Sequence, residues 1–441
     1  MRIPNEDIII GRTPERVKKI GRKGTILLGK SYYETPDALV PASNVYLDVA
    51  DAHVFLITGK RGSGKSYTLG VIAEGFRLLE EEIRKNLSMI LVDTMGIYWT
   101  MGHANLKEKD LLEPYGLEPI AVPLRIFTPE KYYHIYREKG IRTDEPFSLT
   151  FHEITSEDWI KAFQIGTYSP EGILISKIID ELQTRENVEY TFEDVLHAIR
   201  SDKESTLETR NAVISMFKTA RGWGCFSNKG TPIESLARGG EISVLDVSCY
   251  VTMPGGSAVK SLVIGIVSKH LFEQRMEYRK EEELEEIKET EAYFKTPTPK
   301  KEPKLPLVWL VIDEAHEFLP RLREDESAAT APLVSILREG RQPGISLVLA
   351  TQQPGKIHED VMTQSDLVLS HRITAQLDVK ALGLLAQSYM EAGIERAMNR
   401  LPRVKGAAVL FDDSNERIYQ MRVRPRLSWH GGGNPSAVKE D

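Results

Sequence analysis

The chain has 441 residues, 41% of them hydrophobic and 27% charged, with a formal net charge of −7 at pH 7. This mix is ordinary for a globular protein, and the acidic balance excludes a surface that is basic all over, although it leaves room for a local basic groove. The two cysteines, Cys225 and Cys249, are too few for a disulfide scaffold or a four-thiolate zinc site, and they favour a reducing compartment. No apolar run approaches the ~20 residues that cross a bilayer, and the first residues lack the layout of a signal peptide. We therefore expect a cytoplasmic chain without a membrane partner.

Short apolar, β-branched runs recur along the chain between segments of helical period. Continuous rather than alternating hydrophobicity predicts strands that are buried on both faces, as in a mostly parallel sheet covered by helices. The predicted fold class is therefore α/β. The predicted strands are residues 54–58, 89–93, 242–247, 308–313, 346–351, 367–370 and 407–411.

Three regions depart from this pattern. The first 50 residues hold short strand-like pieces broken by Gly, Pro and charge, and residues 108–238 are mostly helical in pattern. A run of charges over 275–289 precedes a Pro-rich segment, which predicts a solvated helix end and a mobile linker, with a partner-docking segment as the alternative. The resulting division is a short N-terminal β-rich cap (1–50), a first core part (51–107), a helical insertion (108–238), a continued core (239–274), a charged flexible linker (275–305), a second core part (306–425) and a C-terminal tail (426–441).

A phosphate-binding loop is indicated by residues 59–66, which match G-x-x-x-x-G-K-[ST] in full between an apolar strand and a helical stretch. Glycines let the backbone curl so that its N–H groups point at phosphates, and the helix N-terminus adds a positive dipole. Lys65 is expected to reach the β- and γ-phosphates of a nucleotide, and the Ser66 hydroxyl to bind Mg²⁺. The predicted binding residues are Gly59, Lys60, Arg61, Gly62, Ser63, Gly64, Lys65 and Ser66.

The second half of a nucleotide site is predicted at the end of the apolar run 307–312, where Asp313 and Glu314 follow. Asp313 would hold Mg²⁺ through water, and Glu314 would polarise the water that attacks the γ-phosphate. Acidic pairs also occur at strand ends as helix N-caps. The buried strand before this pair and the phosphate loop elsewhere favour the catalytic interpretation.

Three further polar residues are candidates for catalysis. Gln352 follows the strand 346–351, where a polar side chain is well placed to sense the γ-phosphate. Arg338 and Arg341 lie where a helix turns into that strand. An arginine from a neighbouring subunit can stabilise transition-state charge, worth about 10³ to 10⁵ in rate. A surface salt bridge is the alternative for either arginine, and the sequence does not choose between the two.

Together these motifs resemble the HerA/FtsK superfamily of ring-forming ATPase motors, and the HerA branch in particular. The resemblance covers roughly residues 45–430 and is carried by 59–66, 91–98, 311–316 and the block 337–341 that runs into 350–354. The last block is the most discriminating, because few other phosphate-loop families carry Arg-Glu-Gly-Arg and Thr-Gln-Gln-Pro at this distance behind the acidic strand. The family's Asp-Pro-His-Gly-Glu-Tyr stretch is represented by residues 93–98, which keep only the Asp, the Gly and the Tyr.

The resemblance implies a RecA-like core with a helical insertion, ATP and Mg²⁺ as cofactors, a homo-hexameric ring, and ATP-driven translocation of double-stranded DNA through its pore. It also implies that Arg338 or Arg341 completes a neighbour's active site. The basic tail with Arg424 and Arg426 resembles the family's C-terminal segment that laps onto a neighbour, and an exposed basic end is the alternative.

A second functional class stays open at this point. HerA proteins usually open with a larger β-barrel that docks a nuclease, whereas only about 50 residues precede the phosphate loop here. The alternative is therefore a non-translocating ring ATPase that acts as a nucleotide-gated scaffold or switch for a partner effector such as a nuclease.

Overall fold

A 13-stranded sheet forms the centre of the protein in a computed structural model that describes residues 6–34, 39–184, 189–292, 305–373, 382 and 391–433. The strand order is β1-β3-β2-β13-β12-β11-β4-β10-β9-β5-β8-β6-β7. The strands are β1 (Ile8–Ile10), β2 (Thr25–Glu34), β3 (Leu39–Asp48), β4 (Val54–Thr58), β5 (Leu87–Asp93), β6 (Arg125–Pro129), β7 (Glu145–Phe147), β8 (Ile242–Asp246), β9 (Leu307–Ile312), β10 (Ile345–Thr351), β11 (Leu367–His371), β12 (Ala407–Asp412) and β13 (Arg417–Val423).

The half of the sheet from β11 to β7 is parallel throughout. Every residue of β5 and β10 is buried, as expected for strands with helices on both faces. The predicted α/β class is thus confirmed. Because parallel strands end at one edge of a sheet, the residues that follow β4, β5, β8, β9 and β10 gather there.

The other half of the sheet is mostly antiparallel. Strands β11, β12, β13, β2 and β3 pair antiparallel in turn, and β1 adds to β3 in parallel. The pieces expected to form a separate N-terminal cap therefore extend the central sheet, through the pairing of β2 with β13. The first 50 residues also contain a helix, α1 (Pro14–Ile20), with Thr13 as its N-cap.

Two hydrophobic cores lie on the two faces of the sheet. Alternate residues of one strand enter different cores: Leu56 packs with the helices of one face, and Phe55 and Ile57 pack with α2 (Lys65–Leu78) on the other. The first face is covered by α11 (Gly256–Ala292) and α12 (Thr330–Glu339), which pack against each other. This three-layer arrangement fixes where α2 begins, and with it the phosphate loop.

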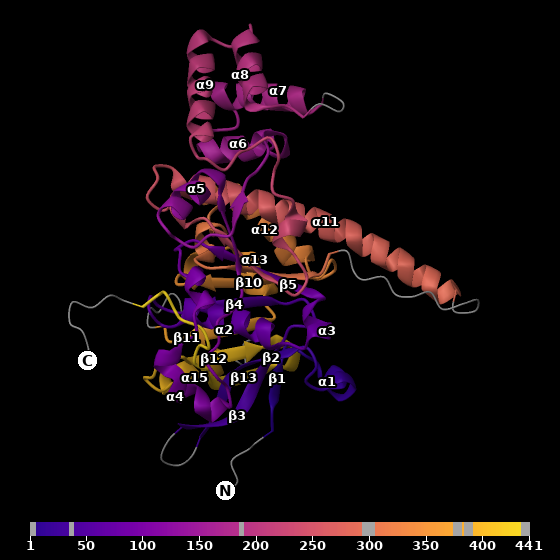
Figure 1. Cartoon of the computed structure of the whole chain (residues 1–441), viewed down its shortest axis with the longest axis vertical. Helices are drawn as coiled ribbons and strands as arrows, with labels where there is room; N and C mark the ends of the chain where they lie inside the picture. Colours follow the sequence, from indigo (N-terminus) through magenta and orange to yellow (C-terminus); the bar gives the residue numbers. More distant parts are fainter. Residues whose placement is uncertain are drawn as a thin grey trace, which may run out of the picture.

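The region predicted as a helical insertion is mixed. Strands β6 and β7 lie within it and join the edge of the sheet next to β8, while the helices after them gather at one end of the molecule in Figure 1. These helices are α6 (Ser156–Phe163), α7 (Pro170–Gln183), α8 (Phe192–Ser201) and α9 (Leu207–Arg221). The remaining α-helices are α3 (Glu81–Arg84), α4 (Lys109–Leu112), α5 (Glu130–Glu138), α10 (Ile233–Leu236), α13 (Glu359–Gln364) and α15 (Glu391–Arg400).

The charged segment after residue 275 begins as helix. Helix α11 continues to Ala292, and its last turns run away from the body of the protein in Figure 1, so the charge run over 275–289, for which a solvated helix end was expected, is helical. Ion pairs of Arg279 with Glu282 and Glu283, one turn along the helix, support this exposed stretch. The Pro-rich part of the predicted linker, 296–304, lies outside the described residues. Within the described part of the chain, no helix is both long and apolar enough to span a membrane.

Candidate nucleotide site

The phosphate loop links β4 to α2 at the carboxyl edge of the sheet. Gly59, Gly62 and Gly64 have φ angles of +156°, +73° and +117°, a region that side chains with a Cβ rarely adopt. A Cβ on Gly59 would also lie 2.8 Å from the Cβ of His371 in β11. The loop therefore needs glycines both for its curl and for its close packing on the neighbouring strand.

Lys65 begins α2 and lies buried over the loop. Its side chain is 6% exposed, and its Nζ donates to the carbonyl oxygen of Lys60 at 3.3 Å. Burial lowers the pKa of Lys65, and the nearby carboxylates of Glu314 and Asp313 oppose this effect. The ammonium group thus lies between the loop and the acidic pair, where the phosphates of a nucleotide would meet it.

The acidic pair follows β9 and reaches the start of α2. The Ser66 hydroxyl donates to Asp313 Oδ2 at 2.5 Å, and the Glu314 backbone N–H donates to Asp313 Oδ1 at 2.9 Å. A serine hydroxyl that donates its proton keeps oxygen lone pairs free, and Mg²⁺ prefers oxygen ligands. Ser66 and Asp313, 247 positions apart, therefore form a donor set that fits the predicted magnesium ion.

Glu314 lies in a strained conformation beside Gln352. Its φ is +52°, in the left-handed region that non-glycine residues seldom occupy. The Gln352 amide donates to Glu314 Oε1 at 3.0 Å, while Oε2 is buried, makes no hydrogen bond with a described residue and lies 3.5 Å from His316 Nδ1. Burial, followed by repulsion from Asp313, raises the pKa of Glu314, and Lys65 opposes the rise. A carboxylate with one open oxygen and a raised proton affinity has the properties of a general base.

The two candidate arginines lie away from this group. Arg338 is in the last turn of α12, and Arg341 is in the turn that leads into the amino end of β10, at the opposite edge of the sheet from the phosphate loop. Arg338 pairs with Asp360 of α13 at 2.7 Å. Neither arginine approaches the nucleotide site of its own chain. Either one could therefore stabilise transition-state charge only at the site of a neighbouring subunit.

Two further residues belong to this site: Tyr98, which is the tyrosine kept in the family stretch 93–98, and His371, which no motif marks. Tyr98 is buried, and its hydroxyl donates to Asp313 Oδ2 at 3.4 Å, because β5 and β9 are neighbours. Burial and the nearby carboxylates of Asp313 and Asp93 raise the pKa of Tyr98 well above its usual value, so the hydroxyl keeps its proton. His371 packs beneath the loop with Nε2 at 2.8 Å from Thr68 Oγ1, and burial lowers its pKa to about 4. The strand order brings both residues to the site: the family stretch 93–98 marks Tyr98 without giving it a role, and no local motif marks His371.

The C-terminal segment packs on α2 of its own chain. Arg424 and Arg426 are buried and donate to the two oxygens of Glu74, at 2.8 and 2.5 Å. The two arginines and hydrogen bonds from Ser428 and Leu427 outweigh the effect of burial and lower the pKa of Glu74 to about 2. These two arginines are therefore not an exposed basic end, and the tail is described only to residue 433.

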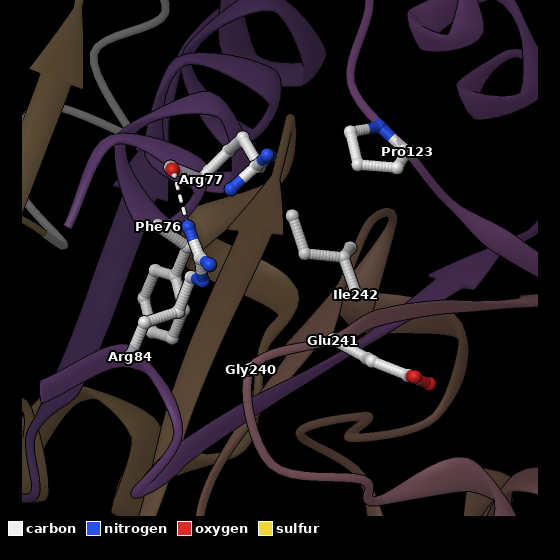
Figure 2. A pocket seen from close by; sticks show the side chains of 7 residues that line it. All are labelled: Phe76, Arg77, Arg84, Pro123, Gly240, Glu241 and Ile242. Carbon is white, nitrogen blue, oxygen red and sulfur yellow. Dashed lines mark hydrogen bonds between the residues drawn. The ribbon is translucent and has the colours of Figure 1, made fainter. Parts of the chain in front are cut away.

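A small cavity lies at the other end of α2 (Figure 2). It encloses about 150 Å³ and is lined by residues from the last turn of α2 and from the amino end of β8. Arg84 points across it toward Arg77 and donates to the Arg77 carbonyl oxygen at 3.1 Å. This cavity is at the opposite edge of the sheet from the phosphate loop, and it is separate from the nucleotide site.

A phosphate loop on a central parallel strand, with an acidic pair two strands away, defines a P-loop ATPase. The family model described as "Helicase HerA, central domain" matches residues 33–271, more than half of the chain, and the chain belongs to this family.

Two curated relatives agree with this assignment, and a solved structure shares the fold. The chain is 24% identical over 380 residues to the probable DNA double-strand break repair helicase HerA of Methanocaldococcus jannaschii, a match that covers 79% of this chain and 69% of that one. It is 26% identical over 374 residues to HerA of Pyrococcus furiosus, covering 80% of this chain and 63% of the relative. The chain thus spans about two thirds of these relatives' length. VirB4 of Thermoanaerobacter pseudethanolicus shares the fold, with a TM-score of 0.50, 12% identity, and coverage of 91% of this chain and 96% of that chain.

Proposed function

We propose that the protein is an ATP-driven translocase of double-stranded DNA that works as a hexameric ring. The observation that carries the proposal is the meeting of Ser66, Asp313, Glu314 and Gln352 at the end of the phosphate loop, in a chain of the HerA family. The two curated relatives are named as DNA double-strand break repair helicases, which favours DNA as the substrate of the motor.

In the proposed mechanism, the loop N–H groups and Lys65 hold the phosphates of ATP. Ser66 and Asp313 would hold Mg²⁺, which when bound neutralises charge on the β- and γ-phosphates. Glu314 accepts a proton from a water molecule as that water attacks the γ-phosphorus, and the bond to the β-γ bridging oxygen breaks to release ADP. Gln352 holds the Glu314 carboxylate through Oε1 and leaves Oε2 for the water.

Movement of DNA would follow from loops at the carboxyl edge, which change with the nucleotide. The segments after β5 and β8 follow Asp93 and Asp246, which end the first and second strands beyond the acidic pair in the order of the sheet. In a ring they are the candidates to contact the duplex. Contacts to phosphates are electrostatic and independent of sequence, so the affinity for DNA is expected to fall steeply with salt.

The test is the rate of ATP hydrolysis with and without double-stranded DNA, at low and at high salt. A translocase is expected to hydrolyse ATP faster with DNA at low salt, and to lose this stimulation as salt weakens binding. Between about 50 and 200 mM salt the affinity should drop on the order of 10³-fold or more if six or more phosphates are contacted. If DNA does not change the rate of ATP hydrolysis and no DNA binding is found at low salt, the translocase proposal is contradicted and the scaffold or switch ATPase is favoured.

A further inference from the structure

The loop that follows β5 is tied together by the side chain of its first residue. Asp93 Oδ1 accepts hydrogen bonds from the backbone N–H groups of Met95 at 3.1 Å and Gly96 at 2.7 Å, and Oδ2 accepts that of Tyr98 at 2.9 Å. Gly96 has a φ of +71°, and a Cβ there would lie 2.8 Å from Ser248 Oγ. The first turn of the loop is thus tied together as one unit that includes Tyr98.

Tyr98 joins this loop to the predicted metal ligand. Its side chain is 2% exposed, and its hydroxyl donates to the same oxygen of Asp313 that accepts the Ser66 hydroxyl. Asp313 Oδ2 therefore receives one hydroxyl from α2 and one from the β5 loop. The two hydroxyl groups reach Asp313 from opposite sides of β9 in the strand order. Helix α2 follows β4, which is separated from β9 by β10, whereas β5 adjoins β9 on its other side.

The outer part of the same loop faces solvent. Trp99 is 38% exposed and Met95 is 60% exposed, although both are apolar and flank a fully buried tyrosine. Trp99 packs edge-on against His103, with ring centroids 6.1 Å apart. One short segment thus has an inner residue on the metal ligand and outer residues on the surface.

We propose that Tyr98 is a positioning residue that holds the Asp313 carboxylate for Mg²⁺ and makes the loop around Trp99 respond to the state of the metal site. The inference rests on the nucleotide and magnesium site of the proposed function. It goes further by assigning the coupling between that site and an exposed loop to one hydroxyl group. The Tyr98 hydroxyl would carry a change in the position of the Asp313 carboxylate to the loop, and the hydrogen bonds of Asp93 would carry it on to the loop backbone.

The first experiment measures the binding of a fluorescent ADP analogue to the Tyr98→Phe variant, with excess Mg²⁺ and with EDTA. Because the contact is long, at 3.4 Å, we expect the loss of a hydrogen bond of ordinary net strength, which should reduce the gain in affinity from Mg²⁺ by about two- to tenfold. Affinity in EDTA should stay within about twofold of the wild type, because the Tyr98 hydroxyl bonds to Asp313 and not to the phosphate loop or Lys65. An unchanged gain from Mg²⁺ would overturn the proposal, and so would an equal loss in both conditions, which a general structural role predicts.

Tyr250→Phe is a matched control. This tyrosine is also buried, next to the end of β8, and its hydroxyl lies next to the thiol of Cys225. Removal of its hydroxyl should leave the gain from Mg²⁺ unchanged. The binding readout does not involve DNA, so a failure of the translocase proposal would leave it unaffected, and the two outcomes are distinguishable.

The second experiment follows the loop itself and does not depend on whether Tyr98→Phe folds. The chain has five tryptophans, so the emission of Trp99 is obtained as the difference between the wild type and Trp99→Phe. This difference spectrum should change when ADP is added with Mg²⁺ and should not change when ADP is added with EDTA. A Trp99 signal that is the same in both conditions would overturn the coupling.

Discussion

Glu314 combines a strained backbone with an open carboxylate oxygen. A left-handed conformation of a non-glycine residue costs about 1 to 3 kcal/mol and persists only where the surroundings hold it. Here the Gln352 amide and the Asp313 Oδ1 bond to the Glu314 N–H hold the residue on both sides. These contacts fix where the Glu314 carboxylate lies.

Replacing Glu314 with Gln should separate ATP binding from hydrolysis. The amide has nearly the same shape but cannot take a proton from water, so we expect the single-turnover rate to fall by about 10² to 10⁴. Binding of ATP should be retained. In the wild type, the base works only when it is ionised, so the rate should also fall at acidic pH, from a pH above the usual range of a glutamate because the pKa of Glu314 is raised.

Glu317→Gln is the control for this variant. Glu317 lies three positions away, and its carboxylate accepts from Lys260 Nζ at 2.6 Å. Its single-turnover rate should remain close to that of the wild type. If Glu314→Gln hydrolyses ATP as fast as Glu317→Gln, the assignment of the base is wrong.

At the scale of elements, the buried strands were predictable and the pairing of the sheet's second half was not. Seven apolar runs correspond to β4, β5, β8, β9, β10, β11 and β12, because a strand covered on both faces must be apolar throughout. Strand β13 alternates and carries charge, so it did not stand out. Without it, nothing in the sequence connects β2 to the central sheet, and the N-terminal strands were interpreted as a separate cap.

The nucleotide site was predictable to the extent that local motifs mark it. The phosphate loop and the acidic pair are contiguous patterns, and the structure brings Ser66 and Asp313 together. Tyr98 acts at a neighbouring strand end, and Glu74 acts in the middle of a helix, so both depend on contacts between distant segments. Gly70 is the one local hint at the second contact, since a Cβ at this helical position would collide with the Arg426 guanidinium.

Helix α2 depends on the buried ionic cluster around Glu74. Glu74→Gln would leave Arg424 and Arg426 buried with only a neutral partner, and we expect destabilisation by about 3 to 5 kcal/mol. The urea midpoint of unfolding, followed by circular dichroism, should fall accordingly. Glu80→Gln, in the exposed connection after α2, is the control and should leave the midpoint nearly unchanged.

The pH dependence of this effect provides an independent check. The pKa of Glu74 is about 2 in the folded chain and 4.5 ordinarily, so its stabilisation is complete above pH 4.5 and is lost as the pH falls toward 2. The difference in stability between the wild type and Glu74→Gln should therefore shrink below pH 4.5. A difference that stays constant from pH 6 to the acid limit of folding would mean that the carboxylate charge is not what stabilises the cluster.

At the scale of the whole molecule, many of the acidic side chains lie on the projecting part of α11, away from the nucleotide site. The projecting part of α11 is rich in glutamate, and its described side chains from Glu281 to Thr290 are exposed or half-buried. In the proposed ring, this charge would keep particles apart in solution, while the grip on DNA needs positive charge only along the pore. The net charge of −7 is therefore compatible with a motor that moves DNA.

The two edges of the sheet suggest how a ring would complete each active site. The phosphate loop and Glu314 lie at the carboxyl edge, whereas Arg338 and Arg341 lie at the amino end of β10. Arg338 is engaged by Asp360, and the exposed Arg341 has no side-chain hydrogen bond or ion pair within the described part of the chain. We therefore favour Arg341 as the residue that would reach the nucleotide of a neighbouring subunit.

Mixed rings test this assignment. Arg341→Ala alone should lose at least about 10³-fold in turnover if its charge stabilises the transition state. When Arg341→Ala subunits are mixed with Lys65→Ala subunits, an intact phosphate loop can meet an intact arginine at some interfaces, and part of the activity should return. Mixing Lys65→Ala with Glu314→Gln is the control, because both changes lie in the same half of the site. In that mixture every chain lacks either the phosphate-loop lysine or the base. No site then has both groups, and no activity should return. If Arg341→Ala gives no recovery at any ratio, although native mass measurement shows mixed rings, Arg341 does not act across the interface.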